Sequence, residues 1–321
     1  MTSGNAAPRL PIDPVGGYFG AGSVAWQVLS TPAAALMIAQ ITNLLEVPHL
    51  DFQNVLFDHD PLFPTNGKCQ RGHRAGAKSG HFHDRLRRTV SVPLPIVFGS
   101  QRDATSCAAR LMAYHQPMRG FGADGRTPYS ATDPDAMLFA AVTITHAGLI
   151  AYEKFGFAGN GLPQRLPPEQ RDRYFAEMTQ LAVLMGVPEA DIPVTADQVA
   201  QYYRSIADKF TTRAGWRAAQ VATATALLRP TGLADLKATA ADAALTMSAL
   251  FAYTALPKPS RRLHGIPAAA DPVLAVIYAA ALPFFGLLRI GPLRRAAMVW
   301  FLGRNDADAL ENAQAMTQEC R

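Results

Sequence analysis

The chain has 321 residues, of which 49% are hydrophobic and 17% charged, and its formal net charge is +5 at pH 7. This composition supplies the apolar material for a large core and excludes a disordered chain. The cysteines (Cys69, Cys107 and Cys320) form no C-x-x-C pair, so we expect no disulfide framework and a reducing, cytoplasmic compartment.

Helical periodicity dominates the sequence, and period-two alternation is scarce, so we predict an all-α fold. Residues 1–16 lack the apolar stretch of a secretory signal, and we expect them to be flexible. Residues 23–45 are the first predicted helical stretch, interrupted near Pro32. Because the sequence shows neither a repeat nor a linker, we treat residues 1–321 as a single domain.

Residues 68–88 form a basic segment, with seven Lys or Arg and one acid, Asp84. Such a patch suits an anionic group, for example a propionate, a phosphate or a membrane surface. Nucleic acid is not an expected partner, because no DNA- or RNA-binding motif is present.

Two patterns near this segment could hold a metal ion, and we favour neither. The first has the spacing C-x3-H-x7-H-x-H and matches no standard zinc pattern; it consists of Cys69, His73, His81 and His83. We expect these histidines to face solvent or to belong to a lid. The second, Asp58-His59-Asp60, imitates a facial iron triad, but adjacent residues rarely point at one ion.

A helix is predicted to begin at Asp84, and Arg85, Arg88 and Thr89 share one of its faces. Two guanidinium groups this close need an anion or a polar ligand to offset their repulsion. The three residues are therefore candidates for catalysis or ligand binding. The alternative is a solvated, basic end of a helix.

The next predicted helix spans residues 101–119 and carries His115 on its apolar face, with Leu111 and Met112 one turn earlier. A neutral imidazole there can bind iron through one nitrogen while the other bonds to a carbonyl or water. The alternative is a core histidine with satisfied hydrogen bonds. Pro117 indicates that the helix bends or ends there.

Further helices are predicted along the rest of the chain. Residues 120–130 are expected to be a loop, and Asp133 to cap a helix that runs to about Phe155. The next helix covers residues 168–185, and Thr195 with Gln198 forms a capping box at the start of another. Three or four more helices reach residue 318.

Residues 273–288 are the most apolar stretch of the chain. They are shorter than the ~20 residues of a spanning helix, and Pro283 interrupts them. We predict a buried core helix, with contact to a membrane surface as the alternative.

The order of four motifs resembles one known family. RLRRT, YHQPMRG, PYSATDPDAML and AYEKFG follow one another within residues 84–156. This region resembles the haem-dependent oxygenases of the latex-clearing protein (rubber oxygenase) and mycophenolic-acid-pathway oxygenase family. The resemblance implies a globin-like helical core with additional N- and C-terminal helices, a haem b cofactor and dioxygen as co-substrate.

The resemblance also implies roles for individual residues. His115 matches the ligand of the haem iron, and Arg85 and Thr89 match polar residues on the distal side of the haem. Arg119, in the motif that contains His115, is assigned to cofactor binding with them. Arg88 departs from the family, because rubber oxygenases have there a lysine that can cap the iron, whereas a guanidinium stays protonated.

Two other family positions have no counterpart in this sequence. Residues 139–141 read Phe-Ala-Ala where many relatives have Trp-Val-His, and His146, further on, cannot be assumed to replace that histidine. No residue matches the glutamate proposed as the base in rubber cleavage.

We therefore predict a haem-b oxygenase that acts on an apolar small molecule or lipid-like substrate. The resemblance points to an unsaturated or isoprenoid-like compound and to oxidative C=C cleavage. A redox partner is left open. One alternative is a non-catalytic haem sensor or carrier. The other is a haem-free helical protein that binds lipid or a partner through residues 273–302, with Arg294 and Arg295 nearby.

Overall fold

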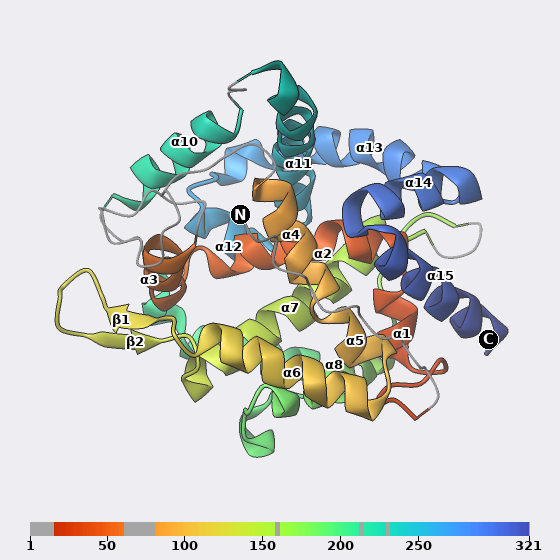
Figure 1. The fold of residues 1–321 in the computed structure, drawn as a ribbon, viewed down its shortest axis with the longest axis horizontal. Coiled ribbons are helices and arrows are strands. Elements are labelled where there is room, and N and C mark those ends of the chain that lie inside the picture. The colour runs from red at the N-terminus through yellow and green to blue at the C-terminus, as the bar shows by residue number, and fades with distance from the viewer. Residues whose placement is uncertain (1–15, 61–80, 158–160, 212–214, 229–231, 321) are drawn as a thin grey trace.

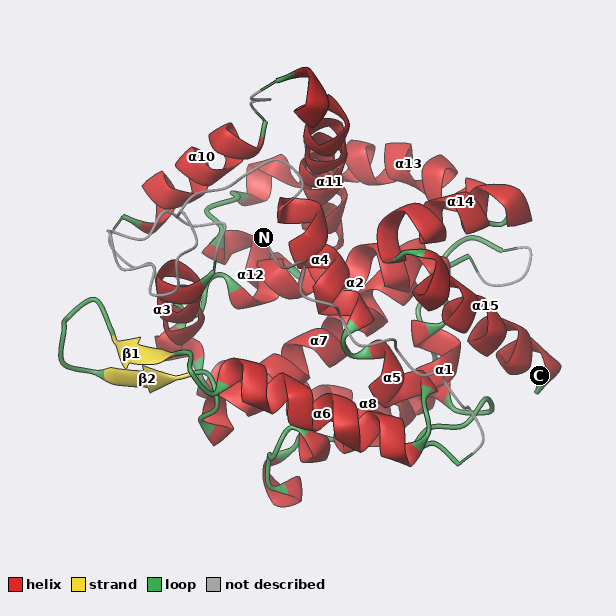
Figure 2. Ribbon diagram, in the orientation of Figure 1, coloured by secondary structure: helices red, strands yellow, loops and turns green. Residues whose placement is uncertain are grey.

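The computed structural model describes residues 16–60, 81–157, 161–211, 215–228 and 232–320, and these form helices with one short hairpin (Figure 2). The all-α prediction is confirmed, while the globin-like core stays a prediction. Residues 1–15 lie outside the described residues, so the expectation of a flexible N-terminus is untested.

The elements follow one another as shown in Figure 1. The helices of the first half are α1 (Val24–Leu29), α2 (Pro32–Glu46), α3 (Leu50–His59), α4 (His81–Ser91), α5 (Leu94–Phe98), α6 (Gln101–His115) and α7 (Pro134–Phe155). The strands are β1 (Arg119–Phe121) and β2 (Pro128–Ser130). The later helices are α8 (Pro168–Leu184), α9 (Ala196–Ser205), α10 (Trp216–Leu227), α11 (Leu236–Ala255), α12 (Lys258–Leu263), α13 (Asp271–Leu287), α14 (Gly291–Leu302) and α15 (Arg304–Glu319). Short 3-10 helices are η1 (Glu189–Asp191), η2 (Ala207–Lys209), η3 (Leu233–Asp235) and η4 (Ala268–Ala270).

Helices α2 and α7 form the centre of the molecule and pack along each other (Figure 1). Both are apolar on almost every side, as expected of helices surrounded by protein. Gly148 of α7 is tightly surrounded: an added Cβ would lie 2.7 Å from Leu29 Cδ2 of α1 and Tyr174 Oη of α8, and 3.3 Å from Ile38 Cδ1 of α2. One hydrophobic cluster built on this pair extends from Phe19 to Ala313.

The predicted interruption near Pro32 and the predicted helix start at Thr195 are confirmed. The Thr31 hydroxyl accepts a hydrogen bond from the Ala34 amide, and Pro32 follows at the first helical position, so the chain breaks between α1 and α2. The Thr195 hydroxyl likewise accepts from the Gln198 amide at the start of α9. The interruption at Pro32 and the cap at Thr195 depend only on neighbouring residues, which is why the sequence was sufficient to find them.

Around the predicted site, three local expectations are wrong. Helix α4 begins at His81 rather than Asp84, and α6 ends at His115 rather than at residue 119. The expected loop 120–130 is largely a hairpin, in which Gly120 of β1 pairs with Tyr129 of β2. Pro117 explains the early end of α6, because proline lacks an amide hydrogen for the helix.

The expected cap of α7 forms only in part. Asp133 does occupy the N-cap position, but its side chain makes no capping hydrogen bond. The start of α7 depends instead on Pro134 at the first turn, where the fixed φ of proline suits a helix.

The prediction of a buried core helix at residues 273–288 is also wrong. Among the residues that the structure describes, two helices have the length and hydropathy of a membrane span, namely α7 and the stretch 268–287 that contains α13. Of their apolar windows, 72% is buried in α7 but only 17% in the α13 stretch. Helix α13 lies at the edge of the molecule (Figure 1), and only Leu274, Ala281 and Phe285 in it are buried.

Candidate active site

Arg85 and Thr89 lie together on α4, as the sequence predicts. Nη1 of Arg85 donates to the Thr89 hydroxyl over 2.6 Å, one helical turn away. Nε of Arg85 donates to Asp60 Oδ2 over 2.9 Å, which forms an ion pair in which the side chains are 33% and 7% exposed. The counter-charge that the sequence required for the arginines is therefore present within the chain, at the C-terminal end of α3.

The charge of Arg85 is secured by its surroundings. Burial by itself lowers the pKa of the guanidinium, but Asp60, Glu46 and Tyr114 together outweigh it and raise the pKa above its ordinary value. Arg85 is thus a permanent cation whose side chain is held by two hydrogen bonds. Among the described residues, its Nη2 has no hydrogen-bond partner and remains able to donate.

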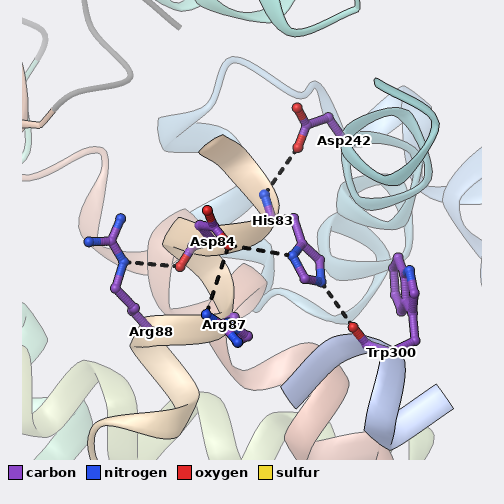
Figure 3. A network of polar contacts seen from close by, with 6 residues as sticks. All are labelled: His83, Asp84, Arg87, Arg88, Asp242 and Trp300. Carbon is purple, nitrogen blue, oxygen red and sulfur yellow. Dashed lines mark hydrogen bonds and ion pairs between the residues drawn. The ribbon is translucent and has the colours of Figure 1, made fainter. Parts of the chain in front are cut away.

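Arg88 is not brought into contact with Arg85. Its side chain is exposed, and Nε donates back to the Asp84 carbonyl over 3.2 Å (Figure 3). In the same view it points away from Trp300, which His83 contacts through Nε2 at 3.2 Å from the carbonyl oxygen. The catalytic role assigned to Arg88 stays a prediction.

Helix α4 is held in place by contacts of His83. Its amide donates to Asp242 Oδ1 over 3.1 Å, and Asp242 is fully buried on α11 (Figure 3). Its ring lies against Trp300 and Phe301 of α14. Cys69 and His73 are outside the described residues, as is the side chain of His81, so the zinc alternative is untested. His83 itself has a structural role as an anchor of α4.

His115 is the last residue of α6, and its half-buried ring is neutral. Burial lowers the pKa of the imidazole below its ordinary value, and the positive charge of Arg85 lowers it further, whereas the Leu111 carbonyl raises it. Nδ1 is buried and has no well-formed hydrogen bond within the described part of the chain. Arg85 and His115 are therefore close enough to interact electrostatically, although they come from different helices.

The Asp58-His59-Asp60 run does not converge on one point. The Tyr129 hydroxyl of β2 donates to Asp58 Oδ2 over 2.6 Å and lies 3.2 Å from Nε2 of His59. Asp60 instead accepts from Arg85. Within the described ranges, no three His, Cys, Asp or Glu side chains are grouped so that they could share a metal ion.

Arg119 follows His115 at the start of β1, and its side chain is exposed. Its backbone lies beside His59. Burial lowers the pKa of the His59 imidazole below its ordinary value, although Asp58 and the Arg119 backbone partly oppose this effect. No contact with Arg85 or Thr89 joins Arg119 to the rest of the predicted set. Its role in cofactor binding stays a prediction.

Glu46, at the end of α2, is a site residue that sequence reasoning missed. It is 9% exposed, and its Oε1 lies 2.8 Å from the Thr143 hydroxyl of α7. Burial raises the pKa of this carboxyl to about 8, although Thr143 and Arg85 lower it. Glu46 is therefore largely protonated at pH 7. No local pattern could have found it, because it ends an apolar helix and meets its partners only in the folded chain.

His146, further along α7, packs within the protein against Phe175 and Tyr203. Its Nδ1 is 3.3 Å from the Tyr203 hydroxyl, and burial, helped by Arg171, lowers the pKa to about 4. The ring is neutral in the physiological range. Nothing in its contacts connects it to Arg85 or His115, so the structure gives no support for treating it as a substitute for the family histidine.

A cavity of about 230 Å³ borders α3, α7 and α9. It is lined by polar residues that include His49, Tyr202 and Lys209, and by Asp51 and Asp135. Lys209 lies 3.9 Å from Asp51 and 3.6 Å from Asp135, so its charge is balanced there. Arg85 and His115 do not line this cavity, and we keep it apart from the candidate active site.

Comparison with known proteins identifies the family. The model described as "ER-bound oxygenase mpaB/B'/Rubber oxygenase, catalytic domain" matches residues 26–289. This range covers more than half of the chain, which therefore belongs to that family, and the resemblance seen in the motifs is confirmed. The match supports an oxygenase activity and ends before α14 and α15. No curated protein and no solved structure matches the chain at a significant level.

Proposed function

We propose that this member of the mpaB and rubber oxygenase family is a haem-b-dependent oxygenase that uses dioxygen to oxidise an apolar, unsaturated substrate. The observation that carries the proposal is the state of His115. Its imidazole is half-buried, has a lowered pKa and has a buried Nδ1 without a hydrogen bond among the described residues. A histidine that served only the core would normally satisfy that nitrogen.

The chemistry of His115 fits ligation of a haem iron. A lowered pKa keeps the ring neutral at pH 7, and only the neutral ring has a lone pair to offer a metal. The Leu111 carbonyl raises the pKa of the ring, but less than burial lowers it, and Nδ1 makes no well-formed hydrogen bond among the described residues. When bound, a haem would supply the activation of dioxygen, which no side chain of the protein provides.

Arg85 and Thr89 would set the polarity of the site. The guanidinium is held by Asp60 and Thr89, and its Nη2 remains able to donate a hydrogen bond. A donor fixed in this way stabilises negative charge without reorganising, whether the charge develops on an oxygen during oxidation or belongs to a propionate. Glu46 would hold a proton near this cation, because its carboxyl is largely neutral at pH 7.

The substrate class follows from the surroundings of His115. Leu111 and Met112, one turn earlier on α6, are partly buried and pack against the main hydrophobic cluster. Apolar side chains beside a small polar group favour an apolar compound over a charged one. Oxidative cleavage of a C=C bond is the reaction proposed, by analogy with the rubber oxygenases of the family.

The first experiment is the absorption spectrum of the purified protein, with hemin supplied during expression. We expect a Soret band in the wild type and loss of most of the haem in His115→Ala. Imidazole added to that variant should restore part of the band, because it replaces the missing ligand. His264→Ala is the matched control: its ring is also partly buried, its pKa is also lowered by burial, and it bonds to the Leu44 carbonyl at 2.7 Å.

Each result separates the proposed function from its alternatives. Substrate-dependent oxygen consumption with an isoprenoid alkene, absent in His115→Ala, would support the oxygenase. A Soret band without oxygen consumption would favour a sensor or carrier. A wild type that stays colourless with hemin, or a His115→Ala variant with full haem content, would remove His115 from its role.

A further inference from the structure

Helix α13 exposes a continuous apolar stripe to its surroundings. Val273, Val276, Phe284 and Leu287 are 60%, 70%, 50% and 49% exposed, and Ala280 between them is also exposed. Steps of three, four and seven residues place them on one face of the helix. Isolated apolar residues are common on protein surfaces, but a stripe along a whole helix marks a contact surface.

The stripe continues beyond the end of α13 onto α14. Ile290, Leu293 and Trp300 are 50%, 46% and 44% exposed, and the last two lie seven residues apart on the same face of α14. The two helices follow each other along one edge of the molecule (Figure 1). We call these exposed residues of α13 and α14 the α13–α14 face.

The opposite side of α13 is fixed to the protein. Leu274, Ala281 and Phe285 are buried, and the Phe285 ring stacks on Phe155 with centroids 4.5 Å apart. The Tyr278 hydroxyl donates to the Lys154 carbonyl over 2.8 Å. Because one side of α13 packs against the rest of the protein, only its other side is available to lipid. It can lie flat on a membrane with its free side inserted.

The charged residues of α13 and α14 that follow Asp271 are all basic. Between Asp271 and Asp306 the chain has no acidic residue, whereas it has four arginines, namely Arg289, Arg294, Arg295 and Arg304. Arg289 and Arg304 are exposed just beyond the ends of α13 and α14, and Arg295 pairs with Asp308 and Glu311 of α15. Apolar side chains bordered by arginines suit the anionic headgroups of a phospholipid surface.

We propose that the α13–α14 face docks on an anionic phospholipid membrane, parallel to its plane, with the apolar stripe in the headgroup region. A second copy of the chain would be a poorer occupant, because two such faces would bring exposed arginines of both copies towards each other, whereas α13 beyond Asp271 and α14 contain no acidic residue to attract them. Trp300 fits the same location, since an indole ring prefers the boundary between headgroups and acyl chains.

The test is flotation of the full chain with vesicles of phosphatidylcholine and phosphatidylserine in a 3:1 mixture, set against vesicles of phosphatidylcholine alone. This mixture has roughly the fraction of anionic lipid found in a cytoplasmic membrane leaflet. We expect the wild type to float with the anionic vesicles and to be released by high salt. Val276→Asp should weaken binding about tenfold or more, because it removes two methyl groups that would enter the membrane and adds a charge within the stripe.

Val221→Asp on α10 is the matched control. Val221 is 67% exposed, against 70% for Val276, so the same substitution is made on an equally exposed valine outside the face. Far-ultraviolet circular dichroism should match the wild type for both variants, and the control should float normally. Wild-type protein that stays at the bottom of the gradient, or Val276→Asp that floats as well as Val221→Asp, would overturn the proposal.

Sedimentation of the same proteins without lipid tests whether the α13–α14 face instead forms a dimer interface. A wild-type dimer that Val276→Asp converts to a monomer, together with no flotation, would assign the face to a second copy and overturn the proposal. Haem content does not enter either measurement, so failure here leaves the proposed oxygenase function untouched.

Discussion

Replacing Glu46 by glutamine should make the protein more stable at neutral pH while leaving its stability at pH 5 almost unchanged. Burial raises the pKa of Glu46 from 4.5 to about 8 in the folded chain. The unfolded chain therefore releases this proton above pH 4.5, whereas the folded chain keeps it until about pH 8. Because the folded state binds more protons in this interval, its free energy of unfolding falls as the pH rises.

The size of the effect follows from the same shift. Each pH unit inside the interval costs the wild type about 1.4 kcal/mol, so the loss between pH 5 and pH 7 is about 3 kcal/mol. Glutamine has the shape of the protonated acid and carries no ionisable proton. Its amide oxygen can still accept a hydrogen bond from the Thr143 hydroxyl, which lies 2.8 Å from Glu46 Oε1, so both the side-chain volume and the hydrogen bond are kept.

Urea denaturation of the wild type and of Glu46→Gln at pH 5, 6 and 7 measures the difference directly. Contributions from all other titrating groups cancel when the two proteins are compared at one pH. The advantage of the variant should grow by about 3 kcal/mol over the range. A difference that stays constant with pH would show that Glu46 is ionised in the folded protein and that its burial is not as described.

Two further substitutions test the packing and the ion pair. Gly148→Ala should cost about 1–3 kcal/mol, because the new Cβ would lie 2.7 Å from Leu29 Cδ2 and Tyr174 Oη. Gly286→Ala, whose Cβ would meet Phe157 at an ordinary 3.6 Å, is its control and should be neutral or stabilising in thermal denaturation; equal melting temperatures for both variants would contradict the close approach. Asp60→Asn should cost about 2 kcal/mol in urea denaturation, less than a fully buried pair because solvent reaches Arg85. A loss below about 0.5 kcal/mol would mean that the pair is screened like a surface contact.

The predicted proximity of Arg85 and Thr89 is confirmed, because it depended on a single helix. Arg85 and Thr89 are four residues apart, so helical geometry alone brings the guanidinium to the hydroxyl, and the structure shows that bond. The same spacing did not fix Arg88, whose long side chain turns back to the Asp84 carbonyl. Helical periodicity sets the face from which a side chain leaves, and the neighbouring elements decide where a flexible side chain then lies.

The amino-acid sequence by itself determined the all-α fold class, the interruption near Pro32, the cap at Thr195, the motifs that place the chain in its family, and the position of His115 beside Leu111 and Met112 on its helix. Each of these depends on residues within a few positions of one another. Only the tertiary structure decided that Asp60 balances Arg85, that Glu46 is buried beside Thr143, and that α13 lies at the surface. An apolar stretch shows that a helix can be buried, but whether anything covers it depends on segments far away in the chain.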